Sequence, residues 1–239
     1  MRSVEYEKNP KSHRKIKRKK RKILLCRFTI LILIAVTTGI YYMNNYRNVE
    51  GVTKIMGTNI LLVNKGHVLS KDYVPANLVN VDIEFLQEAT DEERHMTKES
   101  AEALKELVEG AAADGIYLCG LSGYRSYETQ ENIYSYNLKT QGADHTNSYV
   151  AKAGASEHQL GEAMDLAASW GWIYEGCDEA IWIANNAYKY GFIVRYESGK
   201  EETTGYNYEP WHVRYVGKEV AKKIYESNLT LEDYEKRIN

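Results

Sequence analysis

The stretch SEHQLGEAMD, residues 156–165, places a histidine, a glycine and three carboxylates within ten positions. Gly161 predicts a turn, and the EAMDLA that follows it predicts a short extended run. Alternate residues of a strand face the same side, so Asp165 shares its side with two small alanines. A carboxylate on such a face is costly to bury unless it is paired or binds a cation. The stretch therefore indicates a polar site built on His158 and Asp165.

A second polar cluster, EPWH at residues 209–212, supplies what a catalytic zinc site would still lack. Such a site usually has three protein ligands and an open position for water, and His212 completes the set with His158 and Asp165. Glu209 is the candidate general base, a carboxylate that takes a proton from water and passes it to the leaving amine. Residues i and i+3 of a regular strand face opposite sides, so Glu209 must lie at the strand entrance.

Other interpretations of these histidines stay open at this point. A lone histidine beside acidic residues is most often an ordinary hydrogen-bonded side chain. No HExxH motif occurs in the sequence, which excludes the commonest helix-borne zinc protease.

Three further polar residues are candidates for binding a substrate. Arg125 is expected between a strand and a helix, where the helix N-terminus adds positive potential. A guanidinium there can hold a carboxylate through two hydrogen bonds, or support the oxygen that gains charge during attack on a peptide carbonyl. Gln130 and Ser156 could add hydrogen bonds to the same group. The alternatives are a surface ion pair for Arg125 and solvent-exposed positions for Gln130 and Ser156.

Helices and strands are interspersed along the chain. Apolar residues on one face predict a helix over 97–114, and Ser126 caps a second helix that runs to about Lys139. The strands are too few and the connections too irregular for a doubly wound parallel sheet, so we expect an α+β domain with a central antiparallel sheet flanked by helices. Further expected elements are helices at 178–190 and 218–227, strands at 116–122, 192–196 and 208–216, a strand pair within 60–70 joined at 64–66, and loops at 140–155 and 197–207.

The N-terminal region differs from the rest in charge. Residues 1–27 carry 12 Lys/Arg and 2 Glu, whereas the other 212 residues carry 19 basic and 31 acidic residues. The basic run is followed by about 21 mostly apolar residues, enough to span a bilayer core. Positive charge on this side favours a cytoplasmic N-terminus and an extracytoplasmic domain. The expected segments are a basic cytoplasmic tail at 1–22, one transmembrane helix as anchor at 23–43, a stalk at 44–55 and a folded domain at 56–239.

A cleaved signal peptide and a nucleic-acid-binding segment are the alternatives for this region. No small-x-small cleavage site occurs between Val36 and Asn45, and Cys26 precedes the main apolar run, whereas a lipoprotein cysteine would follow it. Beside a membrane span, a basic run is far more often a determinant of topology, so we expect no nucleic acid partner. No obligate protein partner is evident. Cys119 and Cys177 are expected to be two small buried residues, although a disulfide is chemically permitted outside the cytoplasm.

Several stretches closely resemble the VanY-type D-alanyl-D-alanine carboxypeptidases, a family of zinc metallopeptidases. The resemblance covers about residues 58–220 in matching order. An SxHxxGxAxD pattern followed by EPWH about fifty residues later is far more specific than any single piece. The stretches that carry it are VNKGHVLSKDYVPANLV (63–79), SGYRSYETQ (122–130), SEHQLGEAMDL (156–166), KYGFIVRY (189–196) and TGYNYEPWHVRYVG (204–217).

The resemblance implies a fold, a substrate and a set of roles. The fold is a small α+β domain around an antiparallel sheet, shared with lysostaphin-type peptidases and the hedgehog signalling domain. The substrate is a peptidoglycan stem peptide, trimmed at its terminal D-Ala. The implied roles are one zinc ion held by His158, Asp165 and His212, catalysis by Glu209 and Arg125, and substrate binding by Arg125, Gln130 and Ser156.

Three other functions remain open. An L,D-carboxypeptidase would remove D-Ala from a tetrapeptide with the same metal site. A zinc-containing module could bind wall peptides without cutting them, and would have no need of Glu209. A structural scaffold would use the histidines and the aspartate as ordinary polar residues.

Overall fold

The structure is a computed structural model and describes residues 53–238 of the chain. The expected cytoplasmic tail, the transmembrane anchor and the stalk up to residue 52 lie outside the described residues. Among the helices that are described, none is both long enough and apolar enough to cross a membrane.

A four-stranded antiparallel sheet forms the centre of the domain, in the order β5-β6-β8-β7. Its register places Asp165 of β6 opposite Ser122 on one side and opposite His212 on the other. The two polar clusters of the sequence therefore meet on neighbouring strands, and the predicted central antiparallel sheet is confirmed. The strands are β5 (Leu118–Ser122), β6 (Ala163–Ala168), β7 (Phe192–Val194) and β8 (His212–Tyr215).

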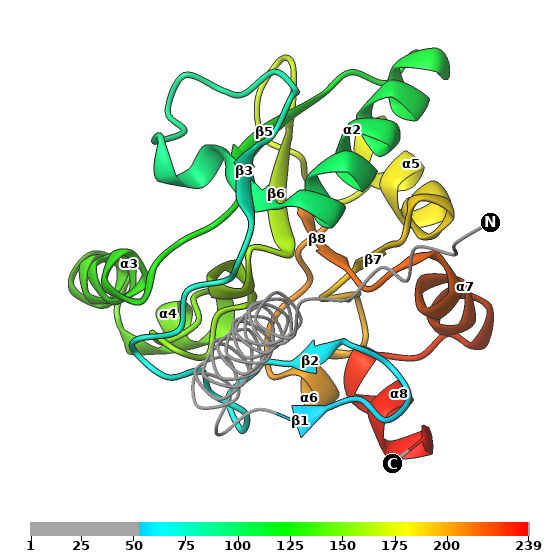
Figure 1. The fold of residues 1–239 in the computed structure, drawn as a ribbon. Coiled ribbons are helices and arrows are strands. Elements are labelled where there is room, and N and C mark those ends of the chain that lie inside the picture. The colour runs from blue at the N-terminus through cyan, green and yellow to red at the C-terminus, as the bar shows by residue number, and fades with distance from the viewer. Residues whose placement is uncertain (1–52, 239) are drawn as a thin grey trace, which may run out of the picture. The chain divides into compact units, whose positions relative to one another are not determined.

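The apolar core lies between this sheet and its helices. Strand β6 is almost continuously apolar and buried, as expected of a central strand covered on both faces. Leu104, Leu107 and Ala111 of helix α2 (Lys98–Ala113) pack in the same cluster as Ala180 and Ile183 of helix α5 (Asp178–Asn186). In Figure 1, α2, α5 and α7 (Lys218–Ser227) lie along one flank of the sheet, and α3 (Tyr127–Gln141) and α4 (Ala143–Tyr149) lie along the other.

The predicted helices are confirmed with small shifts of their ends. Helix α2 begins after Thr97, and Ser126 caps α3 by accepting a hydrogen bond from the backbone N–H of Thr129. The predicted 178–190 helix is α5 continued by the 3-10 helix η3 (Ala187–Tyr190), and it ends at Gly191. Helix α7 covers the predicted residues 218–227.

Two segments predicted as loops contain helices. Helix α4 lies within 140–155, and the single-turn helix α6 (Glu201–Thr204) lies within 197–207. Both are short and polar, so neither has the apolar periodicity on which a prediction from sequence depends. Gly142 separates α4 from α3, because its φ of +82° lies outside the helical range. Glycine adopts this backbone angle more readily than other residues do.

The predicted strand pair within 60–70 is wrong in its pairing. Strand β2 (Leu61–Leu62) pairs with β1 (Thr53–Lys54), which lies in the segment expected to be stalk. Asn64 and His67 form an isolated bridge around the predicted turn, and the chain then diverges because the N–H of Leu69 bonds to Gly154. A second short pair joins β3 (Leu78–Asn80) to β4 (His95–Thr97), which follows the 3-10 helix η1 (Glu92–Arg94).

The chain after α7 forms one more helix, α8 (Leu231–Ile238), which the sequence analysis did not predict. Leu231 and Tyr234 of α8 pack with Leu62 of β2 and Ile224 of α7 in a second apolar cluster. This cluster joins β2, near the start of the described residues, to α8 at their end.

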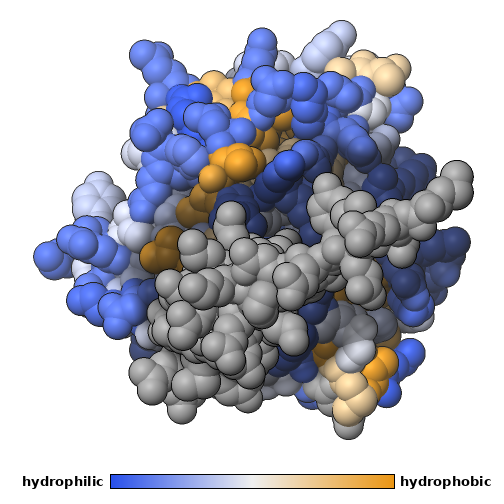
Figure 2. All heavy atoms as spheres, in the orientation of Figure 1, coloured by the Kyte–Doolittle hydropathy of each residue, from blue (hydrophilic) through white to orange (hydrophobic). Residues whose placement is uncertain are grey.

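Cys119 and Cys177 are both buried and free, which agrees with the expectation of two small buried residues. Figure 2 shows one face of the domain, where the visible surface of the described residues is mostly hydrophilic with separate hydrophobic patches.

Candidate active site

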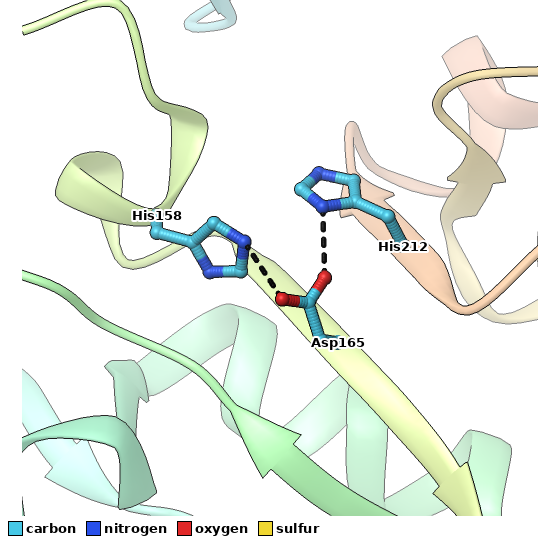
Figure 3. A group of neighbouring side chains, drawn as sticks. All are labelled: His158, Asp165 and His212. Carbon is cyan, nitrogen blue, oxygen red and sulfur yellow. Dashed lines mark hydrogen bonds and ion pairs between the residues drawn. The ribbon is translucent and has the colours of Figure 1, made fainter. Parts of the chain in front are cut away.

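His158, Asp165 and His212 come together at one end of the central sheet (Figure 3). His158 lies on the 3-10 helix η2 (Glu157–Leu160), Asp165 is in β6, and His212 is the first residue of β8. His158 Nε2 is 3.3 Å from Asp165 Oδ2, and His212 Nδ1 is 2.9 Å from Asp165 Oδ1. One ligand atom from each residue lies within 4.8 Å of the others. The predicted convergence of these three side chains is therefore confirmed.

The local backbone explains how η2 leads into β6. Gly161 ends η2 in the left-handed conformation, with φ of +66°, and β6 begins two residues later. An added Cβ at Gly161 would stand 2.8 Å from Leu78 Cδ2 and 3.3 Å from the backbone nitrogen of Thr97. The turn therefore favours glycine mainly for its backbone angle, and the contact with the nitrogen of Thr97 adds a smaller packing constraint.

The orientation of the His158 imidazole suits a metal ion. His158 Nδ1 lies 2.7 Å from the carbonyl oxygen of Gly123, which can only accept, so this nitrogen carries the proton and leaves the lone pair on Nε2. His158 Nε2 is buried without a hydrogen-bond partner. Burial alone would raise the pKa of Asp165, but His158 and His212 outweigh it and hold that pKa well below its ordinary value. Two imidazole nitrogens and one carboxylate fit the three-ligand set of a catalytic zinc ion.

Glu209 lies beside this group, at the entrance of β8 as predicted. Its Oε2 is 4.0 Å from His212 Nδ1, and its side chain is buried. The backbone N–H of His212 bonds to the carbonyl of Glu209, so β8 begins at residue 212 and not at 208 as expected. Burial raises the pKa of Glu209 to about 8. The buried carboxyl group therefore holds a proton more readily than an exposed glutamate does, which suits a group that has to accept one.

Arg125 occupies the predicted junction between β5 and α3. Its backbone N–H donates to the carbonyl of His158 at 3.3 Å, and its Nη2 is 3.8 Å from Asp165 Oδ2. Its Nε is buried without a hydrogen-bond partner, so the guanidinium retains a free donor beside the metal-binding group.

Gln130 and Ser156 are buried, so the solvent-exposed alternative is wrong for both. Gln130 Nε2 donates to the carbonyl of Ala151 at 2.7 Å, and its Oε1 has no partner. All seven predicted site residues line one cleft of about 590 Å³.

Several residues of the cleft were not predicted from the sequence. His145 and Tyr149 come from α4, which was expected to be a loop, and Trp172 comes from the segment between β6 and α5. Glu157 also lines the cleft, between the predicted site residues Ser156 and His158. Its position inside the SEHQ motif was the only feature of the sequence that could have indicated a role for Glu157 in the site.

The antiparallel sheet, the zinc-type donor set and the adjacent glutamate define a zinc metallopeptidase. Comparisons with known proteins agree. Residues 93–218 match the family model of VanY, D-alanyl-D-alanine carboxypeptidase. The chain belongs to this family of carboxypeptidases.

Among curated relatives, the putative carboxypeptidase YodJ of Bacillus subtilis (strain 168) is 42% identical over 204 residues, which cover 82% of this chain and 75% of YodJ. A D-alanyl-D-alanine carboxypeptidase of Enterococcus faecalis (strain ATCC 700802 / V583) is 43% identical over 140 residues, covering 55% of this chain and 52% of that protein.

Two solved structures show the same fold. The LdcB LD-carboxypeptidase has a TM-score of 0.70 and 39% identity, and the match covers 79% of this chain and 94% of that one. A variant of the vancomycin resistance D,D-pentapeptidase VanY, solved in complex with Zn(II), has a TM-score of 0.59 and 37% identity, covering 72% and 96%.

Proposed function

We propose that this chain is a zinc-dependent D,D-carboxypeptidase that hydrolyses the terminal D-Ala from peptidoglycan stem peptides. The observation that carries the proposal is the convergence of three candidate ligands, Glu209 and Arg125 in one cleft. The zinc ligands are His158, Asp165 and His212.

Each residue has a distinct task in this scheme. A bound zinc ion supplies Lewis acidity, which makes water nucleophilic near neutral pH and polarises a peptide carbonyl. Glu209 accepts the proton of the attacking water and returns it to the leaving amine, as its position beside the ligand group allows. Arg125 binds the terminal carboxylate of the substrate or the oxygen that gains charge. Gln130 Oε1, buried and unpartnered, accepts a hydrogen bond from a substrate N–H, and Ser156 adds a further polar contact.

An L,D-carboxypeptidase acting on tetrapeptide stems is the second candidate. The likeness to the LdcB LD-carboxypeptidase, with a TM-score of 0.70, favours it. The likeness to a VanYB structure in complex with D-alanine-D-alanine, with a TM-score of 0.60, favours the first candidate. The two activities would share the metal site, and they differ in how the cleft receives the residue before the scissile bond. Helix α4 lines this cleft through His145 and Tyr149, so it is a candidate for making that distinction.

Synthetic stem peptides separate these candidates. The full-length chain, loaded with zinc, is incubated with a pentapeptide ending in D-Ala-D-Ala and with the corresponding tetrapeptide, and the products are read by mass spectrometry. We expect the pentapeptide to lose one D-Ala and the tetrapeptide to remain intact. Cleavage of the tetrapeptide alone would establish the L,D activity. Binding of both peptides without cleavage would identify a non-catalytic module.

We further propose that residues 1–43 anchor the enzyme in the cell membrane, with the N-terminus in the cytoplasm and the catalytic domain outside. The basic run Lys11–Lys22 and the apolar stretch after it support this arrangement. The substrate would then lie in the same compartment as the active site. Protease added to intact spheroplasts should degrade the catalytic domain, and protection of the domain would refute this topology.

A further inference from the structure

Glu157 is a buried carboxylate for which the proposed reaction has no use. Its side chain is fully inaccessible to solvent, and it lies next to the zinc-ligand candidate His212. Its two oxygens have different surroundings. Oε1 accepts hydrogen bonds from Arg195 Nε at 2.8 Å and from Arg214 Nη1 at 2.9 Å. Oε2 has no hydrogen-bond partner and lies 3.6 Å from His212 Nε2, which is also buried and unpartnered.

The two arginines hold this carboxylate in place. Arg195 donates both of its Nη groups to Glu232 of α8, at 2.9 and 2.6 Å. Arg214 donates to Glu162 at 2.6 Å and to the carbonyl of Tyr215 at 3.0 Å. Each guanidinium is therefore fixed by a second carboxylate, and two positive charges compensate the burial of Glu157. Glu157 Oε2 is the oxygen that this arrangement leaves free.

We propose that Glu157 is a positioning residue for His212, accepting a hydrogen bond from Nε2–H so that Nδ1 presents its lone pair to the metal ion. A neutral imidazole has one N–H, and the partner of that N–H decides which nitrogen is left to bind a metal. In the structure, His212 Nδ1 lies 2.9 Å from Asp165 Oδ1, and Nε2 lies 3.6 Å from Glu157 Oε2, which is longer than a hydrogen bond. We expect zinc to replace the proton that Nδ1 donates to Asp165, so that the remaining N–H is on Nε2 and bonds to Glu157. The inference rests on the proposed assignment of His212 as a zinc ligand.

The two histidines are then oriented by different acceptors. The N–H of His158 meets the neutral carbonyl of Gly123, whereas that of His212 meets a carboxylate. A carboxylate makes the imidazole a stronger ligand, and loss of such a partner typically weakens metal binding 10-fold to 100-fold. Glu157 therefore strengthens zinc binding through His212 and is not itself a ligand.

A pair of variants tests this role through zinc affinity, which needs no substrate. Glu157→Gln removes the carboxylate beside His212. Glu232→Gln removes a carboxylate from the same buried arginine and does not touch His212, so it is the matched control. Zinc dissociation constants are measured by competition with a chromophoric chelator, with His212→Ala as the reference for a lost ligand. Urea unfolding of the metal-free proteins shows that each variant is folded.

We expect zinc binding to weaken by about 10-fold to 100-fold in Glu157→Gln and by less than about threefold in Glu232→Gln. An unchanged dissociation constant in folded Glu157→Gln would overturn the inference, as would an equal loss in both variants, since the effect would then be structural. A wild-type chain that binds no zinc would refute the metal assignment itself, and the inference with it.

A second measurement uses only the wild-type protein, in case Glu157→Gln does not fold. Nitrogen-15 spectra of the histidine side chains in the zinc-loaded chain report which ring nitrogen carries the proton. We expect a protonated Nε2 and a metal-bound Nδ1 at His212, and the reverse pattern at His158. A metal-bound Nε2 at His212 would overturn the inference.

Discussion

Glu209 and the three candidate ligands are neighbours with separate tasks. Glu209 lies 4.0 Å from His212 Nδ1 and is not part of the ligand group. We expect Glu209→Gln to lower kcat on a stem peptide by about 10²-fold to 10⁴-fold, because the proton acceptor is lost, while zinc affinity stays close to that of the wild type. Initial rates and chelator competition measure the two effects. Glu106→Gln, at an exposed glutamate paired with Lys218, is the control and should leave both unchanged.

Arg125 gives a second prediction at the residue scale. Arg125→Lys keeps a positive charge near Asp165 but loses the planar group that makes two parallel hydrogen bonds. We expect kcat/KM to fall by about 10-fold to 100-fold, as for loss of a hydrogen bond to a charged group, with no weakening of zinc binding. Steady-state kinetics on the pentapeptide test it. If the variant has the same kcat/KM as the wild type, Arg125 does not bind the substrate.

The residues of the site were predictable to different degrees. His158, Asp165, His212 and Glu209 could be inferred because metal ligation and proton transfer require particular side chains, and those types occur together in two short motifs. Glu157 could not be inferred from the same motif. Its role depends on Arg195 and Arg214, which only the folded sheet brings beside it.

At the scale of elements, helices with a strong apolar face were predicted and short polar ones were not. Helix α2 buries Leu104, Leu107 and Ala111 at helical spacing, so its position was evident from sequence. Helix α4 buries only Thr146, and α8 has a largely charged sequence. The positions of these two helices depend on the segments against which they pack. A local sequence pattern does not reveal those contacts.

The turn between η2 and β6 allows a prediction about the stability of the domain. Gly161→Ala places a Cβ at a φ of +66° and 2.8 Å from Leu78 Cδ2. Gly115→Ala is the matched control, with a φ of +82° and no atom within 4 Å of the added Cβ. We expect Gly115→Ala to cost about 1 kcal/mol in unfolding free energy, and Gly161→Ala to cost about 1 kcal/mol more, because its Cβ also stands 3.3 Å from the backbone nitrogen of Thr97. Urea unfolding of the metal-free proteins measures both, and equal costs would show that the close packing is unimportant.

At the scale of the whole molecule, the buried arginine pair links segments from both ends of the described domain. The family match covers residues 93–218, whereas β1, β2 and α8 lie outside it. Glu232 of α8 nevertheless binds Arg195 and accepts a hydrogen bond from Asn64 at 3.0 Å. The stable unit is therefore larger than the segment that carries the family motifs.

This link predicts how stability depends on pH. Burial alone would raise the pKa of Glu232, but Arg195 outweighs it and lowers that pKa below its ordinary value of 4.5. A lowered pKa adds stability above the unfolded-state pKa, and this stability is lost as the pH falls through the folded-state pKa. We expect the wild type to be more stable than Glu232→Gln at neutral pH, with a difference that shrinks below about pH 4.5. Denaturant unfolding of both proteins between pH 3 and pH 7 tests this, and a difference independent of pH would contradict it.

The buried and unpaired state of Cys119 and Cys177 also affects how the domain reaches its native structure. The described residues contain no covalent cross-link, so folding of this part requires no thiol oxidation and has no slow step of disulfide exchange. In the proposed extracytoplasmic location, the domain would mature without an oxidoreductase. We expect recovery from urea to be equally fast and complete with and without dithiothreitol.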